Sequence, residues 1–439
     1  MLKSFHFLAA VSIAAVILAF FGCSGDDSGR ADPATLRVLN YFDPASPNAA
    51  EETALVWDAF GEANPHIAII REDLYGESYY DRLETYIREE NLPDLIFAWP
   101  GGRSVPLHTG GFLKDLSALA ARDKLQDRYS SAALDGRFQA GGILGVLPAS
   151  LSFAHVFYVN TAVLSELGLR PARTYDELKA QVPLLNAAGY GTALLGNQDS
   201  WVMQRCLFSL VAGRFCGQGW EQRILSGEWS FTRGDFMDAL EFIRSLYADG
   251  VIARSTLLID CREAAKQFAE NRAAYLIDGD WRARDLLALL PERQGDIRLA
   301  LFPDIAGTTL NRSASVSPGP GWAINVKVPE KSAQERAAWR LALWLTGGET
   351  QARLLASGAI SAPSRLDIDE EALNLPPLRK GMAALVRDFE TGAPAIDQIF
   401  PEAVWVPLND GLQELGMGTK TSGEVARTVQ TAFDAWKTR

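Results

Sequence analysis

In the first part of the chain, segments with the hydrophobic pattern of a β-strand alternate with segments with the pattern of an α-helix. Residues 35–42, 67–70 and 94–99 are short apolar or alternating runs, which predict β-strands. The run at 94–99 is almost continuously apolar, as is typical of a strand covered on both faces. Residues 51–64 and 79–90, between these runs, carry apolar residues at helical spacing. This strand–helix order predicts a parallel sheet with helices on both faces.

A similar pattern starts again near residue 145. Its strand-like runs are 145–148, 154–159, 192–195, 273–278, 297–303 and 321–326, and its helical runs are 161–167, 175–188, 331–357 and 381–439. Two α/β units in series predict an α/β protein with two lobes.

The N-terminus has the pattern of a bacterial lipoprotein signal. Lys3 precedes an apolar run over 5–21, and a glycine and Cys23 follow it. A positive charge, an apolar stretch and a small residue before a cysteine predict cleavage of residues 1–22 as a signal peptide and acylation of Cys23. Residues 23–34, which are mostly polar, would then tether the body of the protein to a membrane.

An uncleaved N-terminal membrane helix is the alternative. Phe20 and Phe21 are bulkier than the residues that usually precede such a cleavage site, and the apolar run is close to the roughly 20 residues that a membrane span needs. In both cases we expect the body of the protein outside the cytoplasm, in the periplasm or at the cell surface. No later segment is long and apolar enough to span a membrane, which argues against a permease.

The composition is that of a globular protein, since 48% of the 439 residues are hydrophobic and 22% are charged. A net charge of −12 and the lack of a Lys/Arg-rich patch argue against a nucleic-acid partner and against docking on anionic lipid. Besides Cys23, the chain has Cys206, Cys216 and Cys261. A Cys206–Cys216 disulfide and free buried thiols are both open.

The sequence nominates no catalytic or metal site. Its histidines are not paired at metal-ligand spacing, and it has neither a CxxC motif nor a GxSxG nucleophile motif. The segment 416–420 looks like a phosphate loop but lacks the glycine before Lys420. We therefore expect no metal and no cofactor, and the sequence motifs nominate no catalytic residue.

Aromatic and polar side chains gather at the ends of predicted strands. In open α/β sheets, ligands bind beyond the carboxyl ends of the strands. Aromatic rings stack on the C–H faces of sugars, and carboxylates and amides bond the hydroxyls, so the group favours a carbohydrate site. Any single tryptophan could equally pack in the core. The residues are Tyr41, Phe42, Asp43, Tyr79, Trp99, Trp201, Asp280 and Trp281.

An ordered series of segments resembles one known family, the extracellular solute-binding proteins of the sugar-binding type (family 1) that serve ABC importers. The resemblance covers nearly the whole length from Leu36. The matching segments are Leu-Pro-Asp-Leu-Ile-Phe-Ala (92–98), Gly-Gly-Phe-Leu-Lys-Asp-Leu (110–116), Phe-Tyr-Val-Asn-Thr (157–161), Leu-Gly-Leu-Arg-Pro (167–171), Thr-Tyr-Asp-Glu-Leu (174–178), 268–281, 321–324 and 354–363.

The resemblance implies a two-lobed fold of the type II periplasmic-binding-protein kind, with a hinge and a ligand cleft between the lobes. We expect residues 35–147 and 280–318 in lobe 1 and residues 148–279 and 319–439 in lobe 2. The chain should cross between the lobes near 147–150, 278–280 and 317–321.

It also implies a function in binding rather than catalysis. A monomer captures a mono- or oligosaccharide and delivers it to ABC permease subunits in the membrane, to which a lipid anchor keeps it close. The positions that match the family's ligand residues are Tyr41, Phe42, Asp43, Trp99, Trp201, Asp280 and Trp281, with Tyr79 and Trp322 added.

Other functions stay open at this point. The ligand could be another polar solute, such as a polyamine or glycerol phosphate, and a phosphate would favour Arg103 or Arg282 facing the cleft. A surface glycoside hydrolase would need two facing carboxylates. A sensor that presents a sugar to a membrane receptor would have the same sequence features.

Overall fold

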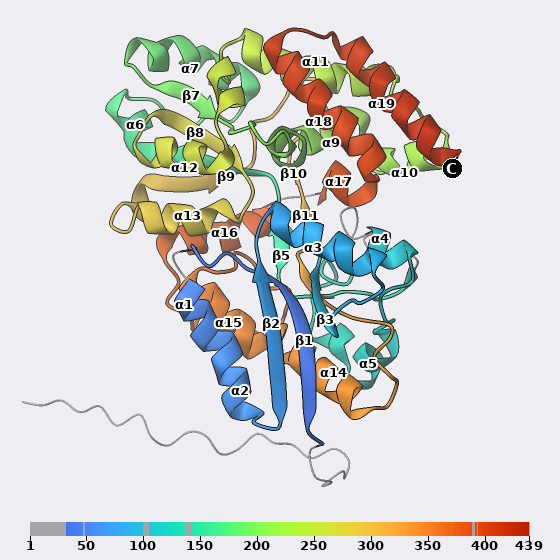
Figure 1. Cartoon of the computed structure of the whole chain (residues 1–439). Helices are drawn as coiled ribbons and strands as arrows, with labels where there is room; N and C mark the ends of the chain where they lie inside the picture. The colour runs from blue at the N-terminus through green and yellow to red at the C-terminus, as the bar shows by residue number, and fades with distance from the viewer. Residues whose placement is uncertain are drawn as a thin grey trace, which may run out of the picture.

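The computed structural model describes residues 32–46, 49–99, 105–136, 142–388, 391–392 and 394–438. These residues form two α/β lobes, stacked one above the other in Figure 1. Within these ranges, no helix is long and apolar enough to cross a membrane. The predicted signal peptide and Cys23 lie outside the described residues.

Lobe 1 is built on a five-stranded sheet in the order β2-β1-β3-β12-β4. Strand β1 pairs in parallel with β2 and β3, as the sequence predicts, while β12 is antiparallel to β3 and β4. The strands are β1 (Ala34–Tyr41), β2 (Ile67–Leu74), β3 (Leu95–Ala98), β12 (Gly321–Ile324) and β4 (Leu147–Pro148).

Helices cover both faces of this sheet because alternate strand residues point to opposite sides. Leu36 and Val38 of β1 lie in one core with Trp57 and Trp339, whereas Leu39 lies in the other with Tyr79. The helical segments of lobe 1 are α1 (Ala49–Glu52), η1 (Thr53–Asp58), α2 (Ala59–Ala63), α3 (Glu77–Arg88), α4 (Val105–Thr109), α5 (Ser117–Arg122), η3 (Leu125–Asp127), α14 (Ala333–Leu345) and α15 (Gly348–Ser357).

Lobe 2 is built on a four-stranded sheet in the order β7-β8-β6-β9. Strands β7 and β8 are parallel, and β6 is antiparallel to β8 and β9. The strands are β7 (Gly191–Leu194), β8 (Ala273–Asp278), β6 (Val156–Asn160) and β9 (Ile297–Ala300). A small parallel pair, β10 (Ser313–Ala314) with β13 (Thr391–Gly392), lies outside this sheet.

The helices of lobe 2 enclose its sheet in two cores. The larger core joins β6 and β8 to α9, α11, α18 and α19, and the smaller joins them to α12, α13 and α16. The helical segments are α6 (Thr161–Glu166), α7 (Tyr175–Ala187), α8 (Trp201–Met203), η6 (Gln204–Phe208), α9 (Ser209–Cys216), α10 (Trp220–Ser226), α11 (Gly234–Ala248), η7 (Arg254–Leu258), α12 (Cys261–Ala269), α13 (Arg282–Leu289), η8 (Gln294–Asp296), α16 (Pro377–Asp388), α17 (Ile396–Ile399), α18 (Glu402–Met417) and α19 (Ser422–Lys437).

Three passages of the chain connect the lobes, and they are hydrogen-bonded to one another. Strand β5 (Leu151–Phe153) follows β4 and pairs antiparallel with β11 (Val316–Pro318), which leads into β12. Leu151 also bridges to Ala362, in the passage from α15 to α16. Leu151 lies in a core of lobe 1 and Phe153 in a core of lobe 2. These passages form the hinge region.

The predicted division of the chain between the lobes is wrong for most of the segment from α13 to α15. Residues 280–318 were expected in lobe 1, but β9 pairs with β6 of lobe 2. Residues 319–439 were expected in lobe 2, but β12 pairs with β3 of lobe 1. The chain does not cross near 278–280, because β8 leads into α13, which packs in the same core. An apolar run predicts a strand but not the sheet that the strand joins.

Candidate ligand-binding cleft

The carboxyl ends of the parallel strands of both sheets point toward the boundary between the lobes. In Figure 1 the arrows of β1 and β2 run from the far end of lobe 1 toward lobe 2. They end at Tyr41 and Leu74, and β3 ends at Ala98 beside them. Strand β8 of lobe 2 ends at Asp278, where the chain reaches the hinge region. Both sheets therefore present their ligand-binding edges to one shared boundary.

Lobe 1 contributes a cluster of aromatic rings to this boundary, which we call the lobe 1 aromatic cluster (Tyr41, Tyr75, Tyr80 and Trp99). The ring of Tyr41 lies at its centre, with centroid distances of 5.0 Å to Tyr75 and 4.8 Å to Trp99. The rings of Tyr80 and Trp99 are 5.6 Å apart. Tyr75 is 39% exposed, and Tyr41 and Trp99 are half-buried. The cluster is thus partly open to a ligand.

Two of the predicted ligand residues lie beneath this cluster and are core residues. Tyr79 is fully buried, and its hydroxyl donates a hydrogen bond to the carbonyl oxygen of Phe97. Burial raises the pKa of Tyr79 well above its ordinary value. The Phe42 side chain is buried, with the Arg71 guanidinium 5.7 Å from its ring. Tyr79 and Phe42 are buried beneath the lobe 1 aromatic cluster, which we also call the lobe 1 rim, and this corrects the sequence-based assignment of both residues to the ligand.

Lobe 2 contributes two tryptophans, Trp201 and Trp281, with ring centroids 5.9 Å apart. The indole Nε1 of Trp281 donates a hydrogen bond to Asp278 at 2.8 Å. The Trp281 ring folds back over Gly279, where a Cβ atom would collide with it. Gly279 is thus required for this close approach. These contacts fix the orientation of one flat ring at the carboxyl end of β8.

A network of charged side chains surrounds Trp201 and Trp281, which we call the lobe 2 rim. The Arg205 guanidinium lies 5.7 Å from the Trp281 ring and donates to both carboxylate oxygens of Asp397 at 2.7 Å. Asp278 accepts a 2.8 Å bond from the Nε of Arg282, whose side chain is 4% exposed. Arg282 is therefore committed to internal ion pairs, so it does not face the cleft as a phosphate ligand would require. The other phosphate candidate, Arg103, lies outside the described residues.

Asp280 and Trp322, also predicted to touch the ligand, have structural positions. The Asp280 carboxylate accepts a 3.1 Å bond from the amide of Phe153, and Ser361 donates to the carbonyl oxygen of Asp280 at 2.8 Å. Asp280 therefore joins two of the hinge passages. Trp322 is buried between Trp57 and Phe97, with ring centroids 5.6 and 5.3 Å away. Neither side chain is open to the cleft.

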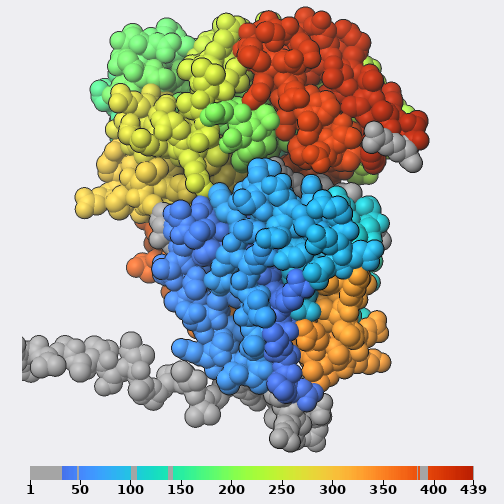
Figure 2. Space-filling view, viewed as in Figure 1, coloured from blue at the N-terminus to red at the C-terminus, as the bar shows by residue number. Residues whose placement is uncertain are grey.

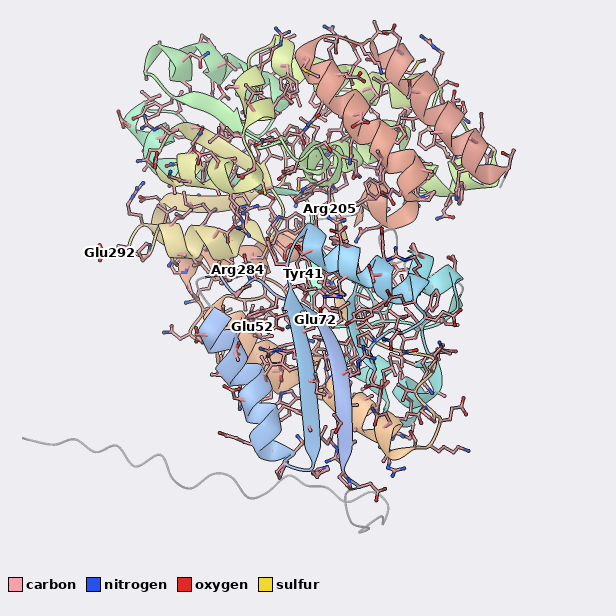
Figure 3. All side chains as sticks on the ribbon, viewed as in Figure 1. Tyr41, Glu52, Glu72, Arg205, Arg284 and Glu292 are labelled. Carbon is pink, nitrogen blue, oxygen red and sulfur yellow. The ribbon has the colours of Figure 1, made fainter. Side chains whose placement is uncertain are left out.

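The two rims face each other across the boundary. The backbone N–H of Gln198, in the loop before Trp201, donates a hydrogen bond to the Ile259 carbonyl oxygen at 3.0 Å, so this loop lies beside the start of α12. From α12, Arg262 reaches Tyr75 and Asp43 of lobe 1 at 2.7 and 2.9 Å. Figure 3 shows Arg205 and Arg284 on the side of lobe 2 that faces Tyr41 and Glu52. In Figure 2, the blue atoms of lobe 1 meet the yellow and green atoms of lobe 2 along this boundary.

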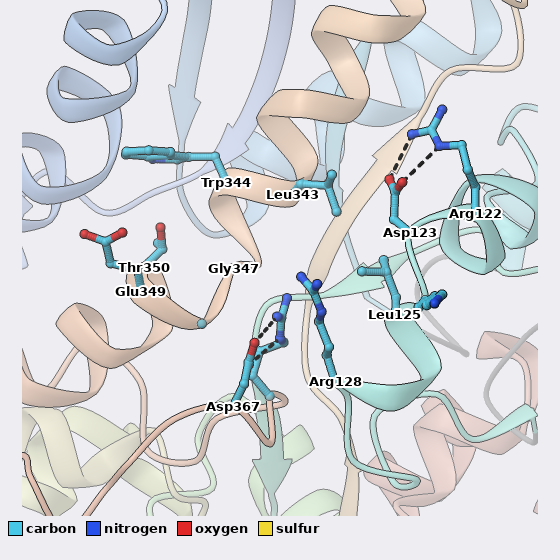
Figure 4. A pocket seen from close by; sticks show the side chains of 13 residues that line it. Arg122, Asp123, Leu125, Arg128, Leu343, Trp344, Gly347, Glu349, Thr350 and Asp367 are labelled. Atoms are coloured by element: carbon cyan, nitrogen blue, oxygen red, sulfur yellow. Dashed lines mark hydrogen bonds and ion pairs between the residues drawn. The ribbon is translucent and has the colours of Figure 1, made fainter. Parts of the chain in front are cut away.

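A separate hollow of about 800 Å³ lies on lobe 1, between α5, η3 and the start of α15 (Figure 4). Its lining includes none of the rim residues. Two of its arginines, Arg122 and Arg365, are held in two-point ion pairs with Asp123 and Asp367. This hollow is distinct from the cleft that the strand ends define.

The sequence does not predict three residues that lie at the boundary between the lobes: Tyr75, Arg205 and Arg262. Tyr75 follows β2, but the apolar run of β2 ends at residue 70 and the strand continues to Leu74 through charged residues. A prediction of the full strand would have placed Tyr75 at a strand end. Arg205 and Arg262 lie on helical segments, and no local signal distinguishes them from solvated surface arginines.

Three cysteines lie in the described residues, and none of them forms a disulfide there. Cys206, Cys216 and Cys261 are free, so the disulfide considered from the sequence is not formed. Burial raises the pKa of Cys261 to about 11, which leaves it a protonated thiol at neutral pH. Among the residues described, no group of three or more His, Cys, Asp and Glu side chains could hold a metal ion.

The two α/β lobes, with strand ends that face one shared boundary, have the architecture of a two-lobed solute-binding protein. The sequence model of the family described as bacterial extracellular solute-binding protein matches residues 45–352, so the chain belongs to this family. No curated protein sequence matches it.

Solved structures share the fold at low sequence identity. A chitin oligosaccharide binding protein is 20% identical, with a TM-score of 0.81 over 92% of this chain and 99% of the other. A structure from work on xylan utilization by the thermophilic bacterium Caldanaerobius polysaccharolyticus is also 20% identical, with a TM-score of 0.80 over 90% and 99%. Maltose-bound MalE3 of T. maritima is 17% identical, with a TM-score of 0.74 over 92% and 100%. These likenesses establish the fold, and with it the predicted two-lobed α/β class.

The hinge position of Asp280 predicts a specific pH dependence of stability. Burial raises the pKa of Asp280 to about 6, and the Phe153 amide and Arg379 offset part of the rise. A carboxyl group whose pKa is higher in the folded chain binds its proton more tightly there, so it stabilises the fold as the pH falls from about 6 toward about 4. The free energy of unfolding of the parent should therefore rise in this window relative to that of Asp280→Asn.

Urea unfolding at a series of pH values measures this difference. Asp58→Asn, at an exposed position of lobe 1, is the matched control and should follow the parent across the window. If the curves of the parent and Asp280→Asn run parallel between pH 7 and pH 4, the hinge carboxyl does not titrate as described.

Proposed function

We propose that this protein captures a mono- or oligosaccharide between its two lobes, as a monomer, and delivers it to the membrane permease of an ABC importer. One observation carries the proposal: aromatic residues follow the parallel strands on both sides of one boundary. Tyr41 ends β1, Tyr75 and Trp99 follow β2 and β3, and Trp281 follows β8. Trp201 lies beside Trp281. Family membership supports the binding of a solute, and the rims support a sugar.

The chemistry of the rims suits a carbohydrate. Sugar rings have apolar C–H faces that pack on aromatic rings, and their equatorial hydroxyls need donors and acceptors at the edges. The cleft has rings on both sides, while Arg205, Asp397 and Asp43 provide charged groups that bond hydroxyls strongly. Rings and charged groups occur on both sides of the boundary, so a sugar could be held by its faces and its edges at once.

The structural neighbours support the same class of ligand. One is described as a chitin oligosaccharide binding protein, one as bound to maltose, and a third, MalE from Bdellovibrio bacteriovorus, as bound to maltotriose. Their sequence identities of 20, 17 and 18% carry the fold and not the individual contacts. They favour an oligosaccharide without specifying its monomer.

Because a hinge joins the two lobes, ligand binding can change their relative orientation. The passages through β5 and β11 and past Ala362 lie side by side, so rotation of one lobe against the other needs changes in only a few backbone angles. A ligand that touches both rims binds the closed form more tightly than the open form and shifts the population toward closure. The permease would then recognise the closed form.

Loss of the Trp281 ring, which is oriented by its hydrogen bond to Asp278, should remove much of the affinity for the sugar. A thermal-shift screen of soluble oligosaccharides first identifies the ligand. Trp281→Ala should then weaken its binding by about 2 kcal/mol, roughly 30-fold, because an oriented and partly desolvated aromatic anchor is lost. Isothermal calorimetry measures the change.

Trp436→Ala is the matched control, since Trp436 lies on the outer helix α19, is 36% exposed and packs on Phe433. It should bind like the parent. Equal affinity of Trp281→Ala and the parent would show that the tryptophan rim is not part of the site.

We further propose that acylation of Cys23 anchors the protein at the membrane. Strand β1 begins at the end of lobe 1 that lies away from lobe 2 in Figure 1. A tether over 23–34 would reach at most about 40 Å when fully extended. It would keep the cleft near the permease and raise its effective concentration there.

Labelling with a fatty-acid analogue in the native host tests the anchor. Cys23→Ser should lose the label and appear in the soluble fraction, whereas Cys261→Ser, at a half-buried position, should keep both the label and the membrane location. A label that persists in Cys23→Ser would place the anchor at another residue.

A further inference from the structure

The side chain of Arg262, from lobe 2, contacts lobe 1 across the boundary between the lobes. The guanidinium of Arg262, near the start of α12, donates from Nη2 to the Asp43 carboxylate at 2.9 Å and to the Tyr75 hydroxyl at 2.7 Å. It also lies 5.1 Å from the centroid of the Tyr75 ring. One cation of lobe 2 thus touches an anion and an aromatic ring of lobe 1.

The lobe 1 partners of Arg262 are fixed in position by contacts within lobe 1. The second carboxylate oxygen of Asp43 accepts a 2.9 Å bond from the amide of Ala45, which fixes the side chain. The Asp43 side chain is only 11% exposed. Tyr75 packs against Tyr41 within the lobe 1 aromatic cluster. Since Tyr41 ends β1 and Asp43 lies two residues further on, the acceptor and the cluster belong to one strand end.

The position of Arg262 is not explained by the needs of its own helix. It is the second residue of α12, where the positive end of the helix dipole disfavours a cation. The helix start is already capped by Asp260, whose side chain accepts from the Glu263 amide at 2.7 Å. Lys266, one turn later, forms its ion pair within the helix, with Glu263. Arg262 is thus the basic residue of α12 that pairs across the boundary.

We propose that Arg262, with Asp43 and Tyr75, forms a latch that holds the lobes together in the absence of ligand and sets how far the empty cleft opens. The latch rests on the proposed function, because closure is the step by which the cleft would retain a solute. In the latch, the Asp43 carboxylate pairs with the other lobe through Arg262, in addition to any contact that it makes with the ligand.

Physical chemistry limits the strength of the latch and makes it sensitive to salt. The Arg262 side chain is 55% exposed, so water and ions screen its ion pair with Asp43. Exposed pairs of this kind shift an equilibrium by about two- to fivefold. Such a shift changes the populations of open and closed forms without locking either, which leaves the cleft free to exchange its ligand.

Small-angle scattering of the full chain without ligand tests the latch. Arg262→Gln should have a larger radius of gyration than the parent at low salt, because about two- to fivefold more of the protein is open. Asp43→Asn should open to a similar extent. The double variant should open no further than either single variant, since both remove the same interaction. In about 0.5 M salt, the parent should approach the variants.

Lys266→Gln is the matched control, since Lys266 has a similar exposure on the same helix and forms its ion pair within that helix, with Glu263. It should behave like the parent. A radius of Arg262→Gln equal to that of the parent at low salt, or additive opening in the double variant, would overturn the latch. Failure of every oligosaccharide to compact the parent would instead contradict the proposed function, because the latch is measured without ligand.

Discussion

The hydrogen-bonded contact among three chain passages is the constraint on which the rest of the structure depends. The β5–β11 pair and the bridge from Leu151 to Ala362 hold these passages together, and Asp280 bonds to the first of them. Because they lie at one place, the two lobes share one boundary and can rotate about one line. The carboxyl ends of the parallel strands meet at that boundary, so any ligand bound there touches both lobes.

Each rim is rigid for a different physical reason. In lobe 1 the rings support one another, with the buried Tyr79 beneath Tyr41 at a centroid distance of 5.3 Å. In lobe 2 the Trp281 ring is held by a charged network centred on Asp278, and Gly279 makes room for it. Rigid rims lose little entropy when they bind, so binding energy remains available for closure of the lobes.

The sequence predicts the elements of this fold well because apolar periodicity is local. It predicts the parallel strands of lobe 1 and the aromatic residues at the ends of β1 and β3. It does not predict which sheet β9 and β12 join, because strand pairing depends on residues far apart in the chain. Likewise, it cannot separate Trp281, which follows β8 and is half-buried at the boundary, from Trp322, which lies near the start of β12 and is buried in the core. Only packing distinguishes them.

Hydrogen–deuterium exchange with and without the best oligosaccharide tests the central claim that the ligand lies between the two rims. The account predicts slower exchange in two separate segments, 75–80 of lobe 1 and 278–284 of lobe 2, with no change in the outer helix α19. Protection of one lobe alone, or of α19 and neither rim, would contradict binding in the cleft between the lobes.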